Sequence, residues 1–232
     1  MNNMKKENEA ADYHKVMVQK PWGYEYLMYE NGTVGIWFLH LKYGAKTSMH
    51  CHPHKKTGLI LLSGDAILSF LHDSTPLKPI SKMMIREGLF HSTQAVSPEG
   101  ASIIEVETPC DKTNLVRLDD EYGRSEKPYE GKDSLIPRTS DCIYLKYPEQ
   151  NEQFKYNLCG CILSIEEINE VSKLKERAAG EIIIVLKGGL FSRTQEPVLN
   201  PGDVVSSDTL HRLAERFTCP HGASILNIRK EA

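Results

Sequence analysis

The 232-residue sequence has no long hydrophobic run, no concentration of basic residues and few cysteines. Its apolar segments are shorter than the roughly 20 residues that cross a bilayer, and its polar N-terminus lacks the apolar core of a secretory signal. Lysine and arginine total 28 against 31 acidic residues, and they are spread along the chain rather than forming the basic surface that nucleic acids need. Six cysteines without an export signal are most simply reduced thiols. We therefore expect a soluble cytoplasmic protein with neither a membrane nor a nucleic-acid partner.

Histidines are grouped in the first half of the sequence. His50 and His52 flank Cys51 and precede an apolar run at 59–62 that ends in a Ser-Gly pair. Side chains alternate faces along a strand, so the two imidazoles point the same way and Cys51 points away. A small β-barrel would bring His91 to the same place, and imidazoles are good metal ligands. The spacing therefore predicts a metal site at His50, His52 and His91.

The chain contains an internal repeat. Three landmarks occur twice, in the same order. They are a turn and strand at 98–106 and 220–228, apolar strands at 57–64 and 181–188, and His91 and His211. Each copy consists of short β-branched runs bounded by Gly, Pro, Asn and Asp, which is typical of antiparallel sandwiches and barrels. The repeat therefore predicts two copies of one β unit.

These features predict an all-β protein with two tandem barrels and one short helix. A linker between the two copies is inferred from the polar residues that separate them. The helix is expected at 165–181, where apolar residues recur at helical spacing. The expected units are a flexible tail at 1–15, a first barrel at 16–125, a linker at 126–139 and a second barrel at 140–232.

Two patterns in the first copy resemble the motifs of the cupin family. In the first, Thr57 stands where a glutamate is usual. In the second, REGLFH at 86–91, Arg86 replaces the usual proline. The residues of the first motif are Gly44, His50, His52, Thr57 and Gly64. The resemblance implies a double-stranded β-helix, also called a jelly roll, and the pairing of two subunits as a homodimer.

The ends of the first copy resemble a narrower family. KPWGYE at 20–25 and VRLDDEYGR at 116–124 are similar to the opening and closing motifs of the cupin domain in type II mannose-6-phosphate isomerases. That family holds its metal with Gln, His, Glu and His, which correspond here to His50, His52, Thr57 and His91. The resemblance implies one divalent metal ion at the three histidines, with Zn, Mn, Fe and Ni as the candidates.

The second copy has lost different ligands. It keeps Glu181 and His211 but has no histidine pair ahead of Glu181. One carboxylate and one imidazole rarely hold a transition metal. We therefore expect the first copy to carry the working site, and the second copy to be structural or to cover the substrate.

Sugar isomerisation needs a base near the carbon acid and a group that polarises the carbonyl. Glu105 and Glu107 share one face of a strand at 101–108, and either could be the base; alternation does not tell whether that face is inside. Lys55 is the best match to a basic residue that follows the histidines in the family, and it is the third catalytic candidate. Cations at a cavity rim hold anions well. The expected substrate-binding residues, all from the two end motifs, are Lys20, Trp22, Glu25, Arg117 and Arg124.

The function expected from these residues and from the resemblance is a metal-dependent isomerase or epimerase that acts on a small molecule, a sugar or sugar phosphate. Two alternatives stay open. A three-histidine iron site with free positions also suits a dioxygenase. The missing glutamate at Thr57 and the degenerate second copy also fit a non-catalytic sugar-binding or regulatory cupin.

Overall fold

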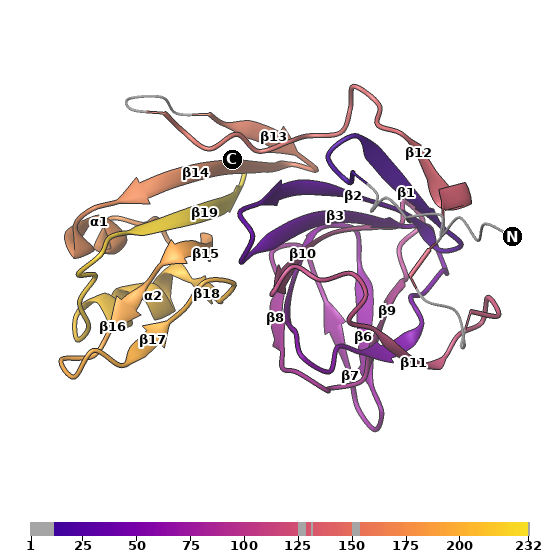
Figure 1. Ribbon diagram of the computed structural model, residues 1–232, viewed down its shortest axis with the longest axis horizontal. Helices are drawn as coiled ribbons and strands as arrows, with labels where there is room; N and C mark the ends of the chain where they lie inside the picture. The colour runs from indigo at the N-terminus through magenta and orange to yellow at the C-terminus, as the bar shows by residue number, and fades with distance from the viewer. Residues whose placement is uncertain (1–11, 125–128, 131, 150–153, 232) are drawn as a thin grey trace, which may run out of the picture.

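The computed structural model describes residues 12–124, 129–130, 132–149 and 154–231 (Figure 1). The tail predicted at 1–15 lies outside the described residues except for its last four. Across the part of the chain that is described, β-strands form four sheets. No helix of these residues is long and apolar enough to cross a membrane.

The first half of the chain forms two facing sheets. The first has the strand order β12-β1-β2-β3-β10-β5-β8, and the second has the order β11-β4-β9-β6-β7. The strands of the first sheet are β1 (Val16–Lys20), β2 (Gly23–Glu30), β3 (Gly35–Leu41), β5 (Lys56–Ser63), β8 (Lys82–Ile85), β10 (Ala101–Thr108) and β12 (Leu135–Pro137). Those of the second are β4 (Met49–Cys51), β6 (Ala66–Phe70), β7 (Ser74–Leu77), β9 (His91–Ala95) and β11 (Val116–Asp119).

The chain passes back and forth between these two sheets. It runs from β3 to β4 in the facing sheet, returns in β5, crosses again to β6, and later alternates through β8, β9, β10 and β11. This winding is a double-stranded β-helix, so the predicted all-β cupin-type fold is confirmed. The space between the sheets is filled by one apolar cluster that includes Trp37, Leu39, Leu61 and Ile103.

The second half forms one further five-stranded sheet and a small hairpin. The sheet has the order β13-β14-β19-β15-β18, and the hairpin pairs β16 with β17. The strands are β13 (Tyr156–Leu158), β14 (Cys161–Ile168), β15 (Ile182–Gly188), β16 (Leu190–Phe191), β17 (Pro197–Leu199), β18 (Val204–Ser206) and β19 (Ala223–Lys230). The helices are η1 (Lys132–Ser134), a 3₁₀ turn before β12, and α1 (Val171–Lys175) and α2 (Ser207–Ala214).

The internal repeat is visible in the strand order. The strand order β13-β14-β19-β15-β18 in the second half matches the order β2-β3-β10-β5-β8 in the first. The same irregularity recurs in both: β10 and β5 shift register between Ser102 and Ile103, and β15 and β19 shift between Val185 and Lys187. These positions correspond in the two copies, so the halves share a backbone plan in addition to sequence landmarks.

A pair of glycines also recurs. Gly64 has φ 75°, and a Cβ there would lie 2.0 Å from the carbonyl oxygen of Gly100. Gly188 has φ 67°, and its Cβ would lie 2.1 Å from the carbonyl oxygen of Gly222. Both the left-handed backbone and the close approach require glycine at the end of β5 and of β15.

The second half differs from the first in its other layer. Where the first copy has β4 and β9, the second has helices α1 and α2, and His211 therefore lies on α2 instead of at the start of a strand. Only the short hairpin of β16 and β17 remains of the facing sheet. The second half is thus only in part the barrel that the sequence predicts.

The helix prediction needs correction. Residues 161–168 are the strand β14, in which buried Cys161, Leu163 and Ile165 alternate with half-buried neighbours. Side chains of a strand alternate with a period of two, so one face of β14 packs on the first half. This packing overrides the helical spacing counted from Ile165. Helix α1 covers only Val171–Lys175, and α2 was not predicted at all.

The two halves are packed together. A single apolar cluster contains Phe38 and Ile60 of the first half and Leu163 and Leu226 of the second, and Figure 1 shows their two sheets side by side. The Nζ of Lys56 lies 2.5 Å from Oδ1 of Asp203 across the boundary. The first sheet is therefore buried on both faces, which explains why its central strands are almost continuously apolar.

The predicted linker at 126–139 contributes to the fold. Its strand β12 pairs with β1 at the edge of the first sheet. The predicted domain boundaries stay a prediction.

Candidate metal centre and its charged cavity

Three histidines meet between the two sheets of the first half. His50 lies on β4, His52 follows one residue after this strand, and His91 begins β9, where it pairs directly with His50. Their ligand atoms all lie within 4.8 Å of one another. The alternation of strand side chains thus brings His50 and His52 together, as predicted, and the sheet register supplies His91. Among the described residues, these three form the only such group that could hold a metal ion.

Each imidazole is oriented by a backbone carbonyl. The Nδ1 of His50 lies 2.8 Å from the carbonyl oxygen of Ser48. The Nδ1 of His52 lies 2.7 Å from that of Asn114, and the Nδ1 of His91 lies 2.9 Å from that of Leu89. A carbonyl oxygen accepts only, so each neutral ring donates its Nδ1–H and keeps the Nε2 lone pair for a ligand. This is the tautomer that a metal site requires.

The three rings are neutral near pH 7. Burial lowers the pKa of His50 well below its ordinary value, and the nearby His91 lowers it further. Burial, together with the ammonium of Lys55, lowers the pKa of His52 to about 3. Burial lowers that of His91 to about 4. Because metal ions bind deprotonated ligands, these pKa values favour an ion over protons.

Thr57 supplies no charged ligand. It lies on β5, paired with Ile85 on one side and with Glu107 on the other, and its Oγ1 is buried without a hydrogen-bond partner among the described residues. The donor set is therefore three neutral imidazoles. Three oriented, neutral imidazoles fit a divalent ion with positions left for water or substrate.

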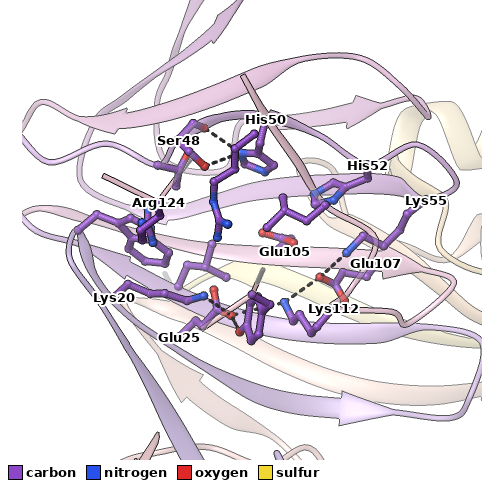
Figure 2. Close-up of a pocket in the computed structure, with 16 residues that line it drawn as sticks. Lys20, Glu25, Ser48, His50, His52, Lys55, Glu105, Glu107, Lys112 and Arg124 are labelled. Carbon is purple, nitrogen blue, oxygen red and sulfur yellow. Dashed lines mark hydrogen bonds and ion pairs between the residues drawn. The ribbon is translucent and has the colours of Figure 1, made fainter. Parts of the chain in front are cut away.

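A cavity opens next to the histidines, and it contains both glutamates of β10. Glu105 and Glu107 point into it, which answers the question that strand alternation left open. Figure 2 shows the two carboxylates between the histidines and the lysines. The cavity measures about 60 Å³, room for a few water molecules. Its lining consists of Lys20, Trp22, Glu25, Leu39, Thr47, Ser48, His50, His52, Lys55, Glu105, Glu107, Lys112, Leu115, Arg117, Arg124 and Tyr129.

Glu107 is held between two buried ammonium groups. Its Oε1 lies 3.0 Å from Nζ of Lys55 and 2.7 Å from Nζ of Lys112. Burial alone raises the pKa of Glu107, but Lys112 and Lys55 outweigh it and hold that pKa well below the usual range. Glu107 is therefore ionised and fixed in place, and it suits positioning better than proton transfer.

Glu105 has a different environment on the same strand. Burial raises its pKa to about 7, although the charge of Lys112 lowers it in part. It also lines the narrow space next to His50, His91 and Leu59. Of the two predicted bases, Glu105 is thus the one whose protonation can change near neutral pH.

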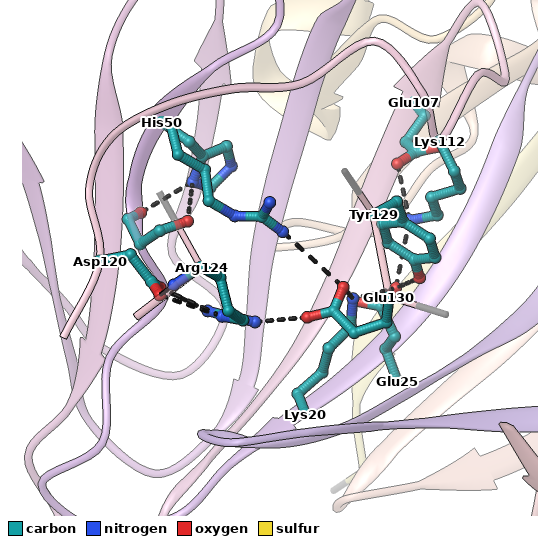
Figure 3. A network of polar contacts seen from close by, with 11 residues as sticks. Lys20, Glu25, His50, Glu107, Lys112, Asp120, Arg124, Tyr129 and Glu130 are labelled. Atoms are coloured by element: carbon teal, nitrogen blue, oxygen red, sulfur yellow. Dashed lines mark hydrogen bonds and ion pairs between the residues drawn. The ribbon is translucent and has the colours of Figure 1, made fainter. Parts of the chain in front are cut away.

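A second group of charges closes the other end of the cavity (Figure 3). Glu130 is its centre. Glu130 Oε2 lies 2.8 Å from Nζ of Lys20 and 3.7 Å from Nη2 of Arg117, and Glu130 also pairs with Arg124. Arg124 in turn binds Asp120 at 2.6 Å.

This end is joined to Glu107 through Glu25 and Lys112. Glu25 accepts a hydrogen bond from Tyr129 and lies 3.5 Å from Nζ of Lys20 and 3.6 Å from that of Lys112. Lys112 then reaches Glu107. A continuous network of buried charges therefore runs from Lys55 to Asp120.

The sequence-predicted site residues come together. Ten of them line the cavity and His91 lines the adjoining space, although their roles stay predictions. Trp22 is buried in the core as well. Four residues of the network were not predicted: Lys112, Asp120, Tyr129 and Glu130. They lie in loops, and Tyr129 and Glu130 lie in the predicted linker, where charged side chains ordinarily face solvent.

Comparisons with known proteins give likenesses of fold. No family model matches the sequence, and no curated protein matches it. KdgF from Halomonas sp. is similar over 44% of this chain and 94% of its own, with 15% identity and a TM-score of 0.39. An uncharacterised conserved protein with a double-stranded β-helix domain from Klebsiella pneumoniae is similar over 52% of this chain and 98% of its own, with 17% identity and a TM-score of 0.41.

A third solved structure is a cupin-2 domain protein, Rru_A2000 from Rhodospirillum rubrum. The likeness covers 43% of this chain and 66% of that one, with 13% identity and a TM-score of 0.38. Each likeness covers about half of this chain. The fold of the first half is identified from the strand order of its two sheets.

Proposed function

We propose that the first half is a metal-dependent isomerase or epimerase whose substrate is a small sugar or sugar phosphate. The observation that carries the proposal is the position of Glu105. This buried carboxylate lines the same space as two of the three metal-binding histidines, His50 and His91. A group that takes up a proton and a group that polarises a carbonyl are the two parts that the reaction needs.

The histidines supply the second part. The Nε2 atoms of His50, His52 and His91 would hold the divalent ion, which when bound acts as a Lewis acid on a substrate oxygen. With no carboxylate at Thr57, the charge of the ion is not offset by its ligands. Such a site favours a substrate that brings an oxygen anion or a polarised carbonyl to the open positions.

Glu105 supplies the first part. Burial raises the pKa of Glu105 to about 7 in the metal-free protein, so this carboxylate is more basic than an exposed one, as a base that takes a proton from carbon needs to be. Apolar Leu39, Leu59 and Ile103 line the same narrow space. Lys55 and Lys112 both bind Glu107, two residues along the same strand, and hold that carboxylate in place.

Cations in the charged network support an anionic or hydroxyl-rich substrate. Lys20, Arg117 and Arg124 line the cavity and converge on Glu130. A substrate phosphate or hydroxyl that displaces part of these ion pairs would find donors already oriented. The reacting carbons would then lie between these cations and the histidines, next to Glu105.

The test is proton exchange at carbon. Protein loaded with Zn, Mn, Fe or Ni is incubated in deuterated water with aldose and ketose phosphates and the parent sugars. Loss of the proton signal at C2 of the aldose, or at C1 of the ketose, is followed by NMR. We expect exchange with at least one substrate, and a decrease of about 100-fold or more in Glu105→Gln. Glu99→Gln, at an exposed turn, is the matched control and should keep the wild-type rate.

Two results would contradict the proposal. One is the absence of exchange with every metal and substrate in protein that demonstrably holds its ion. The other is oxygen consumption by the iron-loaded protein with a sugar substrate and no exchange, which would favour the dioxygenase alternative.

A further inference from the structure

The second half contains a cavity of its own. It measures about 260 Å³ and lies against the face of the second-half sheet that also packs on α1 and α2. Ser164 and Glu166 of β14 line it, together with Asn227 of β19 and Glu181, which directly precedes β15. Arg177, after α1, covers one side.

This cavity occupies the position of the metal cavity in the other copy. By the repeat, Asn227 corresponds to Glu105, Arg229 to Glu107 and Glu181 to Thr57. In the sheet, Asn227 pairs with Ile183 on one side and with Ser164 on the other. The counterpart of the strand that carries His50 is helix α1, so the copy has kept a cavity and lost its histidine pair.

Two buried oxygens in this cavity have no partner. Glu181 is 6% exposed and Asn227 is 5% exposed. Neither Oε2 of Glu181 nor Oδ1 of Asn227 has a hydrogen-bond donor among the described residues. A buried acceptor left unpaired is unfavourable, so these oxygens favour a molecule in the cavity that brings hydrogen-bond donors.

The charges around the cavity are balanced. Among the described residues that line it, Lys155, Arg177 and Arg229 are cationic, and Glu166, Glu176 and Glu181 are anionic. Arg177 Nη1 lies 2.7 Å from Oε2 of Glu166, so one cation is already neutralised. A phosphate or another strong anion would need an excess of cations, and an amine would need an excess of carboxylates.

Size and chemistry together define the ligand. A volume of about 260 Å³ is many times the roughly 10–15 Å³ that a cavity needs to hold one water. Buried acceptors beside arginine donors suit hydroxyl groups, because each hydroxyl both donates and accepts. From these contacts we propose that the second half binds a neutral polyhydroxylated ligand, such as a monosaccharide, with its hydroxyls donating to Glu181 and Asn227.

Isothermal titration calorimetry with D-mannose and D-glucose tests the proposal, with inorganic phosphate as the charged probe. His52→Ala serves as the background, because it disables the first site and leaves the second intact. We expect saturable binding of at least one sugar to this variant with one site per chain, and weaker or no binding of phosphate. Loss of isomerase activity in His52→Ala would not affect this result, so the two proposals fail separately.

Two further substitutions in that background identify the site. Glu181→Gln preserves the shape of the side chain, and Asn227→Leu replaces the amide by an apolar group of similar size. Each should weaken sugar binding at least tenfold, whereas Glu215→Gln, at an exposed position after α2, should not. Thermal unfolding of each variant checks that it is folded. If Asn227→Leu does not fold, the result with Glu181→Gln decides the test.

Three outcomes would overturn the proposal. They are the absence of sugar binding at millimolar concentrations, binding that neither Glu181→Gln nor Asn227→Leu changes, and tighter binding of phosphate than of either sugar.

Discussion

The ammonium of Lys55 lies 3.0 Å from Oε1 of Glu107, and both side chains are almost completely buried. Lys112 approaches the same oxygen at 2.7 Å. One carboxylate therefore pairs with two ammonium groups inside the protein, and Lys112 has a second acidic neighbour in Glu25, at 3.6 Å. Removing Glu107 should therefore lower the free energy of unfolding more than removing Lys55, and this difference can be measured.

We expect Glu107→Leu to destabilise the protein far more than Lys55→Met. Removing the carboxylate leaves two buried cations short of a partner, which costs about 3–5 kcal/mol or more. Removing Lys55 leaves Glu107 still paired with Lys112. Urea denaturation of the two variants measures both free energies of unfolding, and equal losses would contradict the arrangement.

The glycines at the ends of β5 and β15 should be equally intolerant of substitution. Gly64→Ala and Gly188→Ala would each place a Cβ about 2 Å from a backbone oxygen, at 2.0 and 2.1 Å. We expect each to cost more than about 3 kcal/mol. Gly44→Ala is the matched control, since it has a similar φ of 73° but nothing within 4 Å of the added Cβ. Its cost should be about 1 kcal/mol, and a similar cost at all three positions would exclude the contacts as the cause.

Acid should destabilise the metal-free protein. His91 has a pKa of about 4 in the folded protein and about 6.5 when unfolded. Between these values the unfolded chain binds the additional proton, so the free energy of unfolding falls as the pH falls from 6.5 towards 4. At pH 5 this histidine alone should account for a loss of about 2 kcal/mol.

Urea denaturation of metal-free protein at pH 7 and pH 5 measures this effect. His91→Gln should reduce the difference between the two pH values by about 2 kcal/mol, whereas His72→Gln, at an exposed position, should leave it as in the wild type. An unchanged difference in His91→Gln would mean that His91 is not buried as a neutral ring.

The sequence predicts much of the metal centre but less of its surroundings. Strand alternation places His50 and His52 on one face, and the repeat predicts two copies of one β unit. Neither shows that Glu105 faces inward, because that depends on which face of β10 packs against the second sheet. Lys112 and Glu130 could not be found, since a charged residue in a loop is buried only when a partner is buried with it, and the sequence does not show that Glu107 and Arg124, five and six residues away, are buried.

The second half illustrates a different limit. Its apolar strands predict the sheet correctly, but the replacement of two strands by α1 and α2 is not visible in short amphipathic segments. Helix α2 buries only Ser207, Leu210 and Ala214, too few apolar positions to establish a period. Ile165 was assigned to a helix because apolar residues at spacings of three and four also occur by chance where a strand meets a helix.

The measurement that tests the account most directly is the metal content of the protein and of two neighbouring histidine variants. Protein produced without an affinity tag and purified without chelator is analysed by inductively coupled plasma mass spectrometry. His52→Ala removes one of the three oriented imidazoles, and His54→Ala removes an exposed histidine two residues away that is not in the group. The account predicts close to one divalent ion per chain in the wild type and in His54→Ala, and little or none in His52→Ala. Full occupancy in His52→Ala, or no ion in the wild type after incubation with each candidate metal, would contradict it.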